Sequence, residues 1–380
     1  MEGRVSEAII PVFDAHVDSL QRALDLDHDL GRETSGHLDL VRGKRGGLSS
    51  VVLVCFVDPA YLDPKTDGPA ARAALLLREA HKLAARHPDQ LALVGNGAEL
   101  EQAHRSGRIA GIPGIEGGHA IEEELERLQW FFDRGLRVMT LVWNNHLSWI
   151  RSCQSGAGPE IPLGLSDFGR EVVGEMNRLG MVIDLSHAGE QSFYDVLATT
   201  SRPVIASHSG CRALHDHQRN LDDAQLRALA ENGGVVGIVF HPGFLDADAR
   251  AEEVGLRETD AYRALQGKNE SEKFLLQGEF MQQNATPMPA ERLADHVMHA
   301  IEIAGIEHVG LGSDFDGIER GPKHLEDASC YGFLATLLEK RGLGAEEVRA
   351  VMAGNMERVF AEVTGAGALA STAKIRAHLD

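Results

Sequence analysis

Cysteine is scarce in this chain, and the four residues are far apart. They are Cys55, Cys153, Cys211 and Cys330, and no two of them form a C-x-x-C pair. Neither a disulfide framework nor a thiolate zinc site is therefore indicated. We expect four reduced thiols.

Basic residues are also few, since 37 Lys and Arg stand against 57 Asp and Glu, for a net charge of −20. This balance disfavours nucleic acid and anionic membranes as partners. The first residues contain no apolar run of secretory length, and the tail around residues 370–374 lacks the hydrophobic stretch of a lipid-anchor signal. We therefore expect a soluble, cytoplasmic protein with no nucleic-acid or membrane partner.

Strand-like and helix-like stretches alternate along the whole chain, which favours one large domain over residues 1–380. Helix-like composition occurs at 68–86, 122–134, 167–179, 191–198 and 290–304. Eight strand-like runs can be counted, and eight is the number that closes a β/α barrel. We predict an α/β fold, a (β/α)8 TIM barrel, with strands in the runs 9–18, 48–57, 109–116, 138–143, 181–185, 204–206, 234–240 and 309–312.

Two stretches interrupt this alternation. Residues 144–166 are rich in Gly, Ser and Pro, and residues 243–289 form a long polar segment. Each follows the end of a predicted strand, on the side where a barrel enzyme has its site. Both are expected to be insertions that form a lid or a pocket wall.

Ligand-type residues follow five of the predicted strands. His16 and Asp18 are two apart, so on a strand their side chains point the same way and can share one divalent metal ion. Later runs end in further candidates. Because the strands of a β/α barrel open onto one face, we expect these residues to converge. They are Glu116, His187, His208 and Asp314.

Nitrogen and oxygen ligands without sulfur are typical of zinc, with manganese or cobalt as possible substitutes. Five of these residues, the three histidines with Asp18 and Glu116, are too many ligands for one catalytic zinc with an open position, so a two-metal site is predicted. His16 and Asp18 would hold one ion, His187 and His208 the other, and Glu116 would bridge the pair, which would hold a hydroxide. Taken singly, a histidine after a strand often only bonds a loop, and an acid often begins a helix. The recurrence at several strand ends favours a site.

Seven short motifs along the chain resemble the membrane dipeptidase family, also called renal dipeptidases, of the metal-dependent amidohydrolase superfamily. They run in family order over nearly the whole sequence. The motifs are DAHVD at 14–18, IEGG at 115–118, WNNH at 143–146, DLSH at 184–187, SHS at 207–209, RNL at 219–221 and GSDFDG at 312–317.

The resemblance implies two zinc ions on the five ligands named above, with Glu116 also part of the catalytic centre. It further implies that His146 stabilises the oxyanion, that Arg219 pairs with the C-terminal carboxylate of a dipeptide, and that Asp314 transfers the proton. Each role has a physical sense, because a tetrahedral intermediate needs a donor and an arginine fork matches a carboxylate.

Three further residues enter through the resemblance. Asn220 and Tyr61 would contribute to substrate binding, although the segment around Tyr61 matches the family only loosely. Asp316 competes with Asp314 for the acid–base role, but Asp314 directly follows the strand. We therefore assign proton transfer to Asp314.

Together with the resemblance, these observations predict a dinuclear zinc dipeptidase that hydrolyses the amide of free dipeptides. The resemblance also implies that L-Xaa-D-Xaa dipeptides can be among its substrates, which composition alone does not show. The dipeptide is the expected partner, and a homodimer is left open. One alternative is another amidohydrolase, acting on a cyclic amide, lactone or phosphoester; many of these bridge their metals with a modified lysine after strand four, and residues 138–143 contain none. A non-catalytic barrel is the other alternative, but such a chain would be expected to have lost ligands.

Overall fold

A closed ring of eight parallel strands forms the centre of the molecule. The computed structural model describes residues 10–365; Ile9 of the first predicted strand and both ends of the predicted domain, 1–9 and 366–380, lie outside the described residues. The ring closes because β2 pairs with both β1 and β4. The predicted (β/α)8 barrel is confirmed. Its strands are β1 (Val12–Val17), β2 (Leu48–Phe56), β4 (Ile109–Glu116), β5 (Val138–Thr140), β6 (Val182–Asp184), β7 (Ile205–Ser209), β8 (Val235–Ile238) and β9 (Val309–Leu311).

A ninth strand, β3 (Leu91–Leu93), lies outside the ring and was not expected from the sequence. It pairs with residues 109–111 of β4, while β5 pairs with residues 114–116 of the same strand. Three residues are too few to show a strand period, which is why the pattern did not reveal it.

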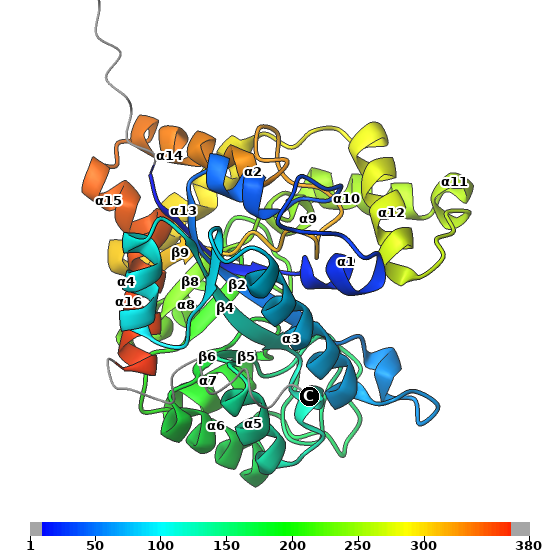
Figure 1. The fold of residues 1–380 in the computed structure, drawn as a ribbon, viewed down its shortest axis with the longest axis vertical. Helices are drawn as coiled ribbons and strands as arrows, with labels where there is room; N and C mark the ends of the chain where they lie inside the picture. The colour runs from blue at the N-terminus through cyan, green and yellow to red at the C-terminus, as the bar shows by residue number, and fades with distance from the viewer. Residues whose placement is uncertain (1–9, 366–380) are drawn as a thin grey trace, which may run out of the picture.

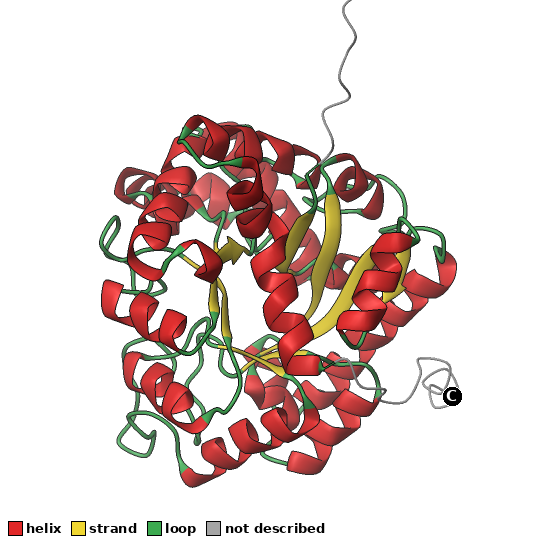
Figure 2. Cartoon of the chain, turned by 90° about the vertical axis from the view of Figure 1, so that its left-hand side faces the viewer, coloured by secondary structure: helices red, strands yellow, loops and turns green. Residues whose placement is uncertain are grey.

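Helices surround the strands, as Figure 2 shows. The segments predicted at 68–86, 122–134, 167–179, 191–198 and 290–304 are helical, but the second begins only at Leu125. Glu122 and Glu123 have positive φ angles of 49° and 57°, which an α-helix does not accept. The helices are α1 (Leu20–Asp25), α2 (Leu40–Arg45), α3 (Pro69–Arg86), α4 (Gly97–Arg105), α5 (Leu125–Asp133), α6 (Asp167–Leu179), α7 (Glu190–Thr199), α8 (Asp223–Glu231), α13 (Ala290–Ala304), α14 (Tyr331–Lys340), α15 (Ala345–Arg349) and α16 (Asn355–Thr364).

One end of the barrel is filled by apolar side chains. The first residues of four strands, Val138, Val182, Ile205 and Val235, belong to one buried cluster with side chains of α16 such as Phe360. These first residues mark the amino ends of the strands, so α16 closes that end. The carboxyl ends remain as the place for a site, as in other barrels of this type.

The segment 243–289 is largely helical. It contains α10 (Ala247–Arg257), α11 (Asp260–Arg263) and α12 (Glu270–Asn284), preceded by α9 (Pro242–Leu245). Asp246 and Asn269 cap α10 and α12 by accepting backbone N–H bonds. Met281 is the only fully buried residue of α12, so no apolar stripe marked this helix in the sequence. In Figure 1, α12 lies beside α1, with which it is in contact.

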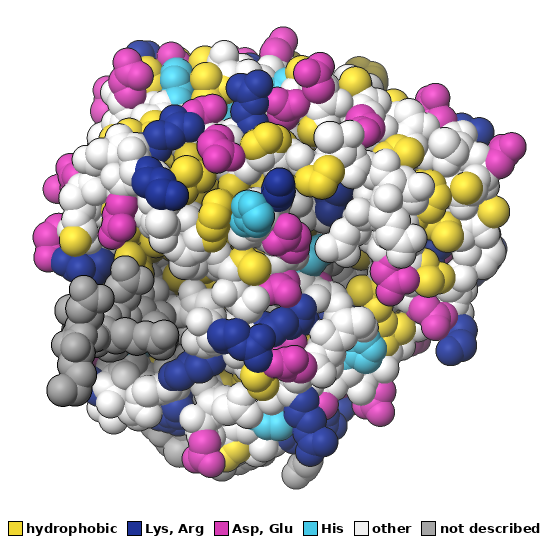
Figure 3. All heavy atoms as spheres, turned by 90° about the horizontal axis from the view of Figure 1, so that it is seen from above, with side chains coloured by type: hydrophobic (Ala, Val, Ile, Leu, Met, Phe, Trp, Pro, Cys, Tyr) yellow, Lys and Arg dark blue, Asp and Glu magenta, His cyan; other side chains and the backbone are white. Residues whose placement is uncertain are grey.

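The distribution of surface charge and the character of the helices can be compared with the partners expected from the sequence. On the face seen in Figure 3, acidic and basic side chains are interspersed. Within residues 10–365, none of the helices combines the length and the apolar character that crossing a bilayer requires.

Candidate active site

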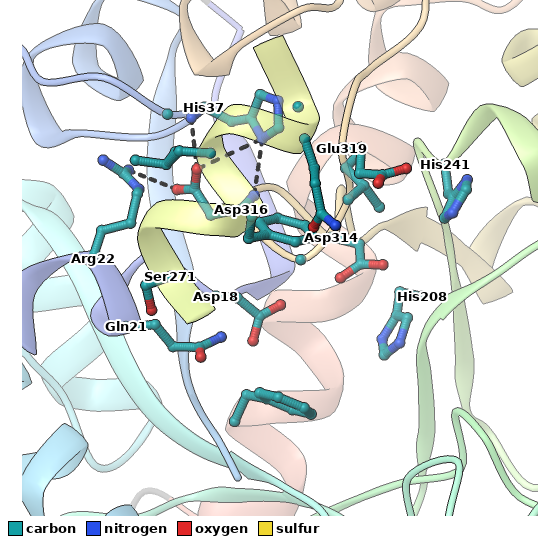
Figure 4. Close-up of a pocket in the computed structure, with 18 of the residues that line it drawn as sticks. Asp18, Gln21, Arg22, His37, His208, His241, Ser271, Asp314, Asp316 and Glu319 are labelled. Carbon is teal, nitrogen blue, oxygen red and sulfur yellow. Dashed lines mark hydrogen bonds and ion pairs between the residues drawn. The ribbon is translucent and has the colours of Figure 1, made fainter. Parts of the chain in front are cut away.

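A cavity of about 550 Å³ opens at the carboxyl ends of the strands. Residues that follow or end five strands line it, and α12 contributes Phe274 and Leu275 to its wall, while Asn144 comes from the 144–166 insertion. The strand-end residues are Asp18, Glu116, His187, His208 and Asp314. The structure therefore brings the predicted ligands to one place. Figure 4 shows Asp18, His208 and Asp314 facing a common space.

Glu116 lies in the middle of this group. Its Oε2 is 3.6 Å from His16 Nε2, and its Oε1 is 2.9 Å from His187 Nε2 and 3.5 Å from His208 Nε2. Asp18 Oδ2 lies 3.5 Å from the same nitrogen of His16. Each carboxylate oxygen of Glu116 thus faces a different part of the ligand set, which is the arrangement that a bridging carboxylate needs.

The hydrogen bonds behind the histidines determine which nitrogen faces the cavity. Ser207 Oγ donates its only proton to Asp184 Oδ2 at 2.6 Å, so it accepts from His208 Nδ1 at 2.8 Å and from His16 Nδ1 at 3.3 Å. In their neutral form both rings therefore carry their proton on Nδ1. Their Nε2 atoms are left with free lone pairs, the state in which histidine binds a metal.

The donor set fits divalent metal ions. His187 Nε2 and His208 Nε2 are 3.1 Å apart, and His16 Nε2 and Asp18 Oδ1 are buried without a hydrogen-bond partner. Buried polar atoms are costly unless they are paired, and a cation would satisfy all four. Ligand atoms of two triads lie within 4.8 Å of one another: His16, Glu116 and His208, and His16, Asp18 and Asp314.

Burial and close charges shift the pKa values of these carboxyl groups in opposite directions. Burial raises the pKa of Asp18 to about 6, against the lowering effect of His16. Burial also raises the pKa of Asp314 well above its ordinary value, and Asp18 and Glu116 add to this. In Glu116 burial acts the same way, but His16 and His187 outweigh it and lower the pKa. Glu116 is therefore the carboxylate that stays charged most readily.

The carboxylates of Asp314 and Asp316 point in different directions. Figure 4 shows the Asp314 carboxylate in the cavity and the Asp316 carboxylate turned toward Arg22 and His37. Asp316 accepts from Arg22 Nη2 at 2.7 Å and from the His37 backbone at 2.7 Å.

A Cβ on Gly317 would lie 2.3 Å from Asp18 Oδ2 and 2.4 Å from Asp314 Oδ1, so only glycine leaves room for both carboxylates.

Arg219 lines the cavity, whereas His146 does not. The Arg219 side chain is buried and lines the cavity, and its Nη2 donates to the His208 carbonyl at 3.0 Å. His146 is not among the lining residues. Its Nδ1 accepts from the Ser152 backbone at 3.3 Å, and its Nε2 lies 3.5 Å from the Ser155 carbonyl.

Asn220 and Tyr61 do not line this cavity. Asn220 lines a smaller neighbouring pocket together with His187 and Arg219. The Asn220 amide is used for backbone contacts, because Oδ1 accepts from Gly210 N at 2.9 Å and Nδ2 donates to the carbonyls of His215 in the same loop and Phe244 in α9. Tyr61 lies in a short 3-10 helix, Pro59–Leu62, under the Arg72 guanidinium, and does not line the cavity. The segment around Tyr61 matches the family motif only loosely, and this was the signal in the sequence.

Asp184 and Ser207 were missed as functional residues by the sequence reasoning. Asp184 is buried and accepts from Ser207 Oγ, from the Ser207 backbone at 2.8 Å and from the Ser186 backbone at 3.0 Å. It fixes the hydroxyl that orients two ligand histidines. An acid at the end of a buried strand, next to a candidate ligand, was the available signal.

Comparisons with known proteins identify the family of this chain. The family described as membrane dipeptidase (Peptidase family M19) matches residues 4–373. An uncharacterized dipeptidase of Schizosaccharomyces pombe is 32% identical over 365 residues, which cover 92% of this chain and 79% of the other.

Two solved structures are similar over nearly their whole length. A metallo peptidase of Rhodobacter sphaeroides, liganded with a phosphinate mimic of the dipeptide L-Ala-D-Ala, has a TM-score of 0.75 and 28% identity, covering 93% of this chain and 99% of the other. A dipeptidase described as a metallo peptidase of family M19 has a TM-score of 0.77 and 26% identity, covering 94% and 100%. The resemblance inferred from the motifs is thus confirmed: the chain belongs to the membrane dipeptidase family, peptidase family M19, a family of metallo dipeptidases.

Proposed function

We propose that this dipeptidase works with two zinc ions, one beside His16 and Asp18 and one beside His187 and His208, with Glu116 shared between them. The observation that carries the proposal is the position of Glu116, whose Oε2 faces His16 while Oε1 faces His187 and His208. When bound, such a metal pair polarises a carbonyl and lowers the pKa of a water molecule, which supplies a nucleophile at neutral pH.

Asp314 is the proposed general base and acid. It lines the cavity, and its ligand atom lies within 4.8 Å of those of His16 and Asp18. The raised pKa of Asp314 lets its carboxyl group hold the proton taken from water and then give it to the departing amine. Without that transfer the amine would leave as an unstable anion.

Arg219 is the proposed partner of the substrate's C-terminal carboxylate. Its guanidinium is anchored by one bond to the His208 carbonyl, and its Nε has no hydrogen-bond partner although it is buried. A carboxylate would complete these hydrogen bonds in a fork that arginine is shaped to make. Because Arg219 and Glu116 line the same cavity, a carboxylate bound by Arg219 would favour short substrates.

His146 remains the proposed donor to the oxyanion. Its ring is held through Nδ1 by Ser152, while Nε2 makes only a long contact of 3.5 Å to Ser155 O, so Nε2 is available to a substrate. Catalytic hydrogen bonds are often long before substrate binds. The proposal requires the 144–166 insertion to bring this ring over the carbonyl.

We include dipeptides with a D residue at the C-terminal position among the substrates. The support is the Rhodobacter sphaeroides protein, which is liganded with a mimic of L-Ala-D-Ala. Aromatic side chains of Phe56, Trp143 and Phe244 line the cavity here and could pack against either enantiomer.

The test is a hydrolysis screen of L,L, L,D and D,L dipeptides with the zinc-loaded protein, using the same dipeptides with an amidated C-terminus as controls. We expect hydrolysis of free dipeptides, including L,D pairs, and a large loss on amidation. Failure to cleave any dipeptide, or equal cleavage of amidated ones, would contradict the proposal.

A further inference from the structure

Three side-chain amides form a chain of hydrogen bonds that ends on a candidate metal ligand. Gln218 Nε2 donates to Gln154 Oε1 at 2.6 Å, and Gln154 Nε2 donates to Asn144 Oδ1 at 2.8 Å. The same Oδ1 lies 2.9 Å from His187 Nδ1. This series, Gln218–Gln154–Asn144–His187, is called the amide relay below. Asn144 and Gln154 belong to the 144–166 insertion, and Gln218 is the neighbour of Arg219.

The relay has a direction, because each amide has a donor end and an acceptor end. With Gln154 donating to Asn144, the Asn144 oxygen faces the histidine, so His187 Nδ1 must be the donor. The proton then lies on Nδ1, and Nε2 is left with a free lone pair facing Glu116 Oε1 at 2.9 Å.

Reversing the relay would have the opposite effect. Asn144 would then donate to His187 Nδ1, and the proton of a neutral ring would move to Nε2. That nitrogen lies 3.1 Å from His208 Nε2, in the middle of the ligand set. A protonated nitrogen cannot bind a metal ion.

His187 therefore differs from the other two histidines. The acceptor for His16 and His208 is Ser207, a fully buried residue of the barrel strand β7. The acceptor for His187 comes from an insertion. The same insertion also holds the His187 backbone, because Cys153 N donates to the His187 carbonyl at 2.7 Å, and His187 has a φ of 68°.

We propose that Asn144 and Gln154 are positioning residues for one half of the metal site. They hold His187 in the tautomer that leaves Nε2 free to bind a metal ion. The affinity of the site for the ion beside His187 therefore depends on the conformation of the 144–166 insertion and of the loop that carries Arg219. The inference rests on the proposed function only for the role of His187 as a ligand.

The first experiment measures stepwise zinc affinities by competition with a chelating dye. Asn144→Leu removes the acceptor with little change in size, and should weaken one of the two zinc sites on the order of 10- to 100-fold. Asn144→Asp keeps an acceptor and should restore the affinity. Asn145→Leu is the matched control, since the neighbouring Asn145 amide is buried without a hydrogen-bond partner and so makes no hydrogen bond to His187.

The second experiment uses Gln154→Glu to reverse the direction of the hydrogen bond between residue 154 and Asn144. A glutamate can still accept from Gln218, but it can no longer donate to Asn144, which must turn its NH2 toward the new carboxylate. The added negative charge would by itself attract a cation. We expect weaker zinc binding at one site despite that charge, together with a changed visible absorption spectrum of the cobalt-substituted protein.

The possible outcomes distinguish a failure of the amide relay from a failure of the proposed metal pair. Two zinc ions on the wild-type chain, with affinities and cobalt spectra unchanged in Asn144→Leu and Gln154→Glu, would overturn the relay and leave the dipeptidase site standing. Fewer than two ions on the wild type would overturn the metal pair and the relay with it. Circular dichroism checks folding, and Gln154→Glu, at a half-exposed position, covers the case in which Asn144→Leu does not fold.

Discussion

Asp314 and Asp316 offer a paired test of the account, because asparagine at each position should produce a different defect. Both residues have positive φ angles, 62° and 67°, and asparagine tolerates that conformation. Asp316→Asn should reduce stability, because Asp316 is the partner of the buried Arg22 guanidinium at 2.7 Å. Asp314→Asn should reduce turnover instead.

The magnitude for Asp316 follows from its pKa. Burial would raise that pKa, but Arg22 and His37 outweigh it and lower the value from 3.8 to about 2. At about 1.4 kcal/mol per pH unit this corresponds to about 2.5 kcal/mol of stability. Breaking a buried ion pair from one side costs about 3–5 kcal/mol, so we expect a loss of about 3 kcal/mol. With an unfolding entropy of about 2.1 cal/mol/K per residue, Tm should fall by about 4 °C.

The pH dependence has a definite sign. A carboxyl group whose pKa is lowered on folding stabilises the protein above its unfolded pKa, and loses that effect as the pH falls through the folded value. The stability difference between wild type and Asp316→Asn should therefore be constant from about pH 8 to pH 5 and shrink between about pH 4 and pH 2. Urea unfolding at several pH values measures it.

Asp314→Asn should behave in the opposite way. Burial raises the pKa of Asp314, so its removal should cost the metal-free protein no stability. Without the proton acceptor, kcat should fall roughly 100- to 10,000-fold. A nearly silent Asp314→Asn together with a folded, stable but inactive Asp316→Asn would refute the assignment of the two residues.

Three other substitutions test separate parts of the site. Arg219→Met and amidation of the substrate should each cost about 2–4 kcal/mol in kcat/KM, and the losses should not add, because both remove one interaction; additive losses in the double cycle would refute the pairing. Gly317→Ala should lower kcat and zinc content together, since its Cβ would lie 2.3 Å from Asp18 Oδ2; full zinc content would contradict this. Ser271→Ala removes the bond from α12 to Asp25 at 2.6 Å while the Asp25–Arg72 ion pair stays in place, and it should raise KM more than it lowers kcat in steady-state assays; an unchanged KM would show that α12 does not depend on this contact.

The sequence predicted the barrel and the meeting of the ligands for the same reason. In a parallel barrel the carboxyl ends of all strands lie on one rim, so His16, Glu116, His187 and His208 needed only correct strand ends to be placed together. The polar helices α10 and α12 were not predicted, because their stability comes from caps and tertiary contacts and not from an apolar stripe.

Loop residues were placed less well. Nothing in the local pattern around Tyr61 or Asn220 encodes where a loop turns, and neither residue lines the main cavity. The partners of Asn144 lie 10 and 43 positions away along the chain. Contacts of that range depend on the course of two loops, which spacing does not determine.

The central claim is that a metal pair around Glu116 drives dipeptide hydrolysis, and a zinc titration tests it most directly. Metal-free protein receives zinc in steps while the release of amino acid from L-Ala-D-Ala is followed. The account predicts negligible hydrolysis without zinc and a rate that reaches its plateau at two ions per chain. A plateau at one ion per chain, or full hydrolysis by the metal-free protein, would contradict it.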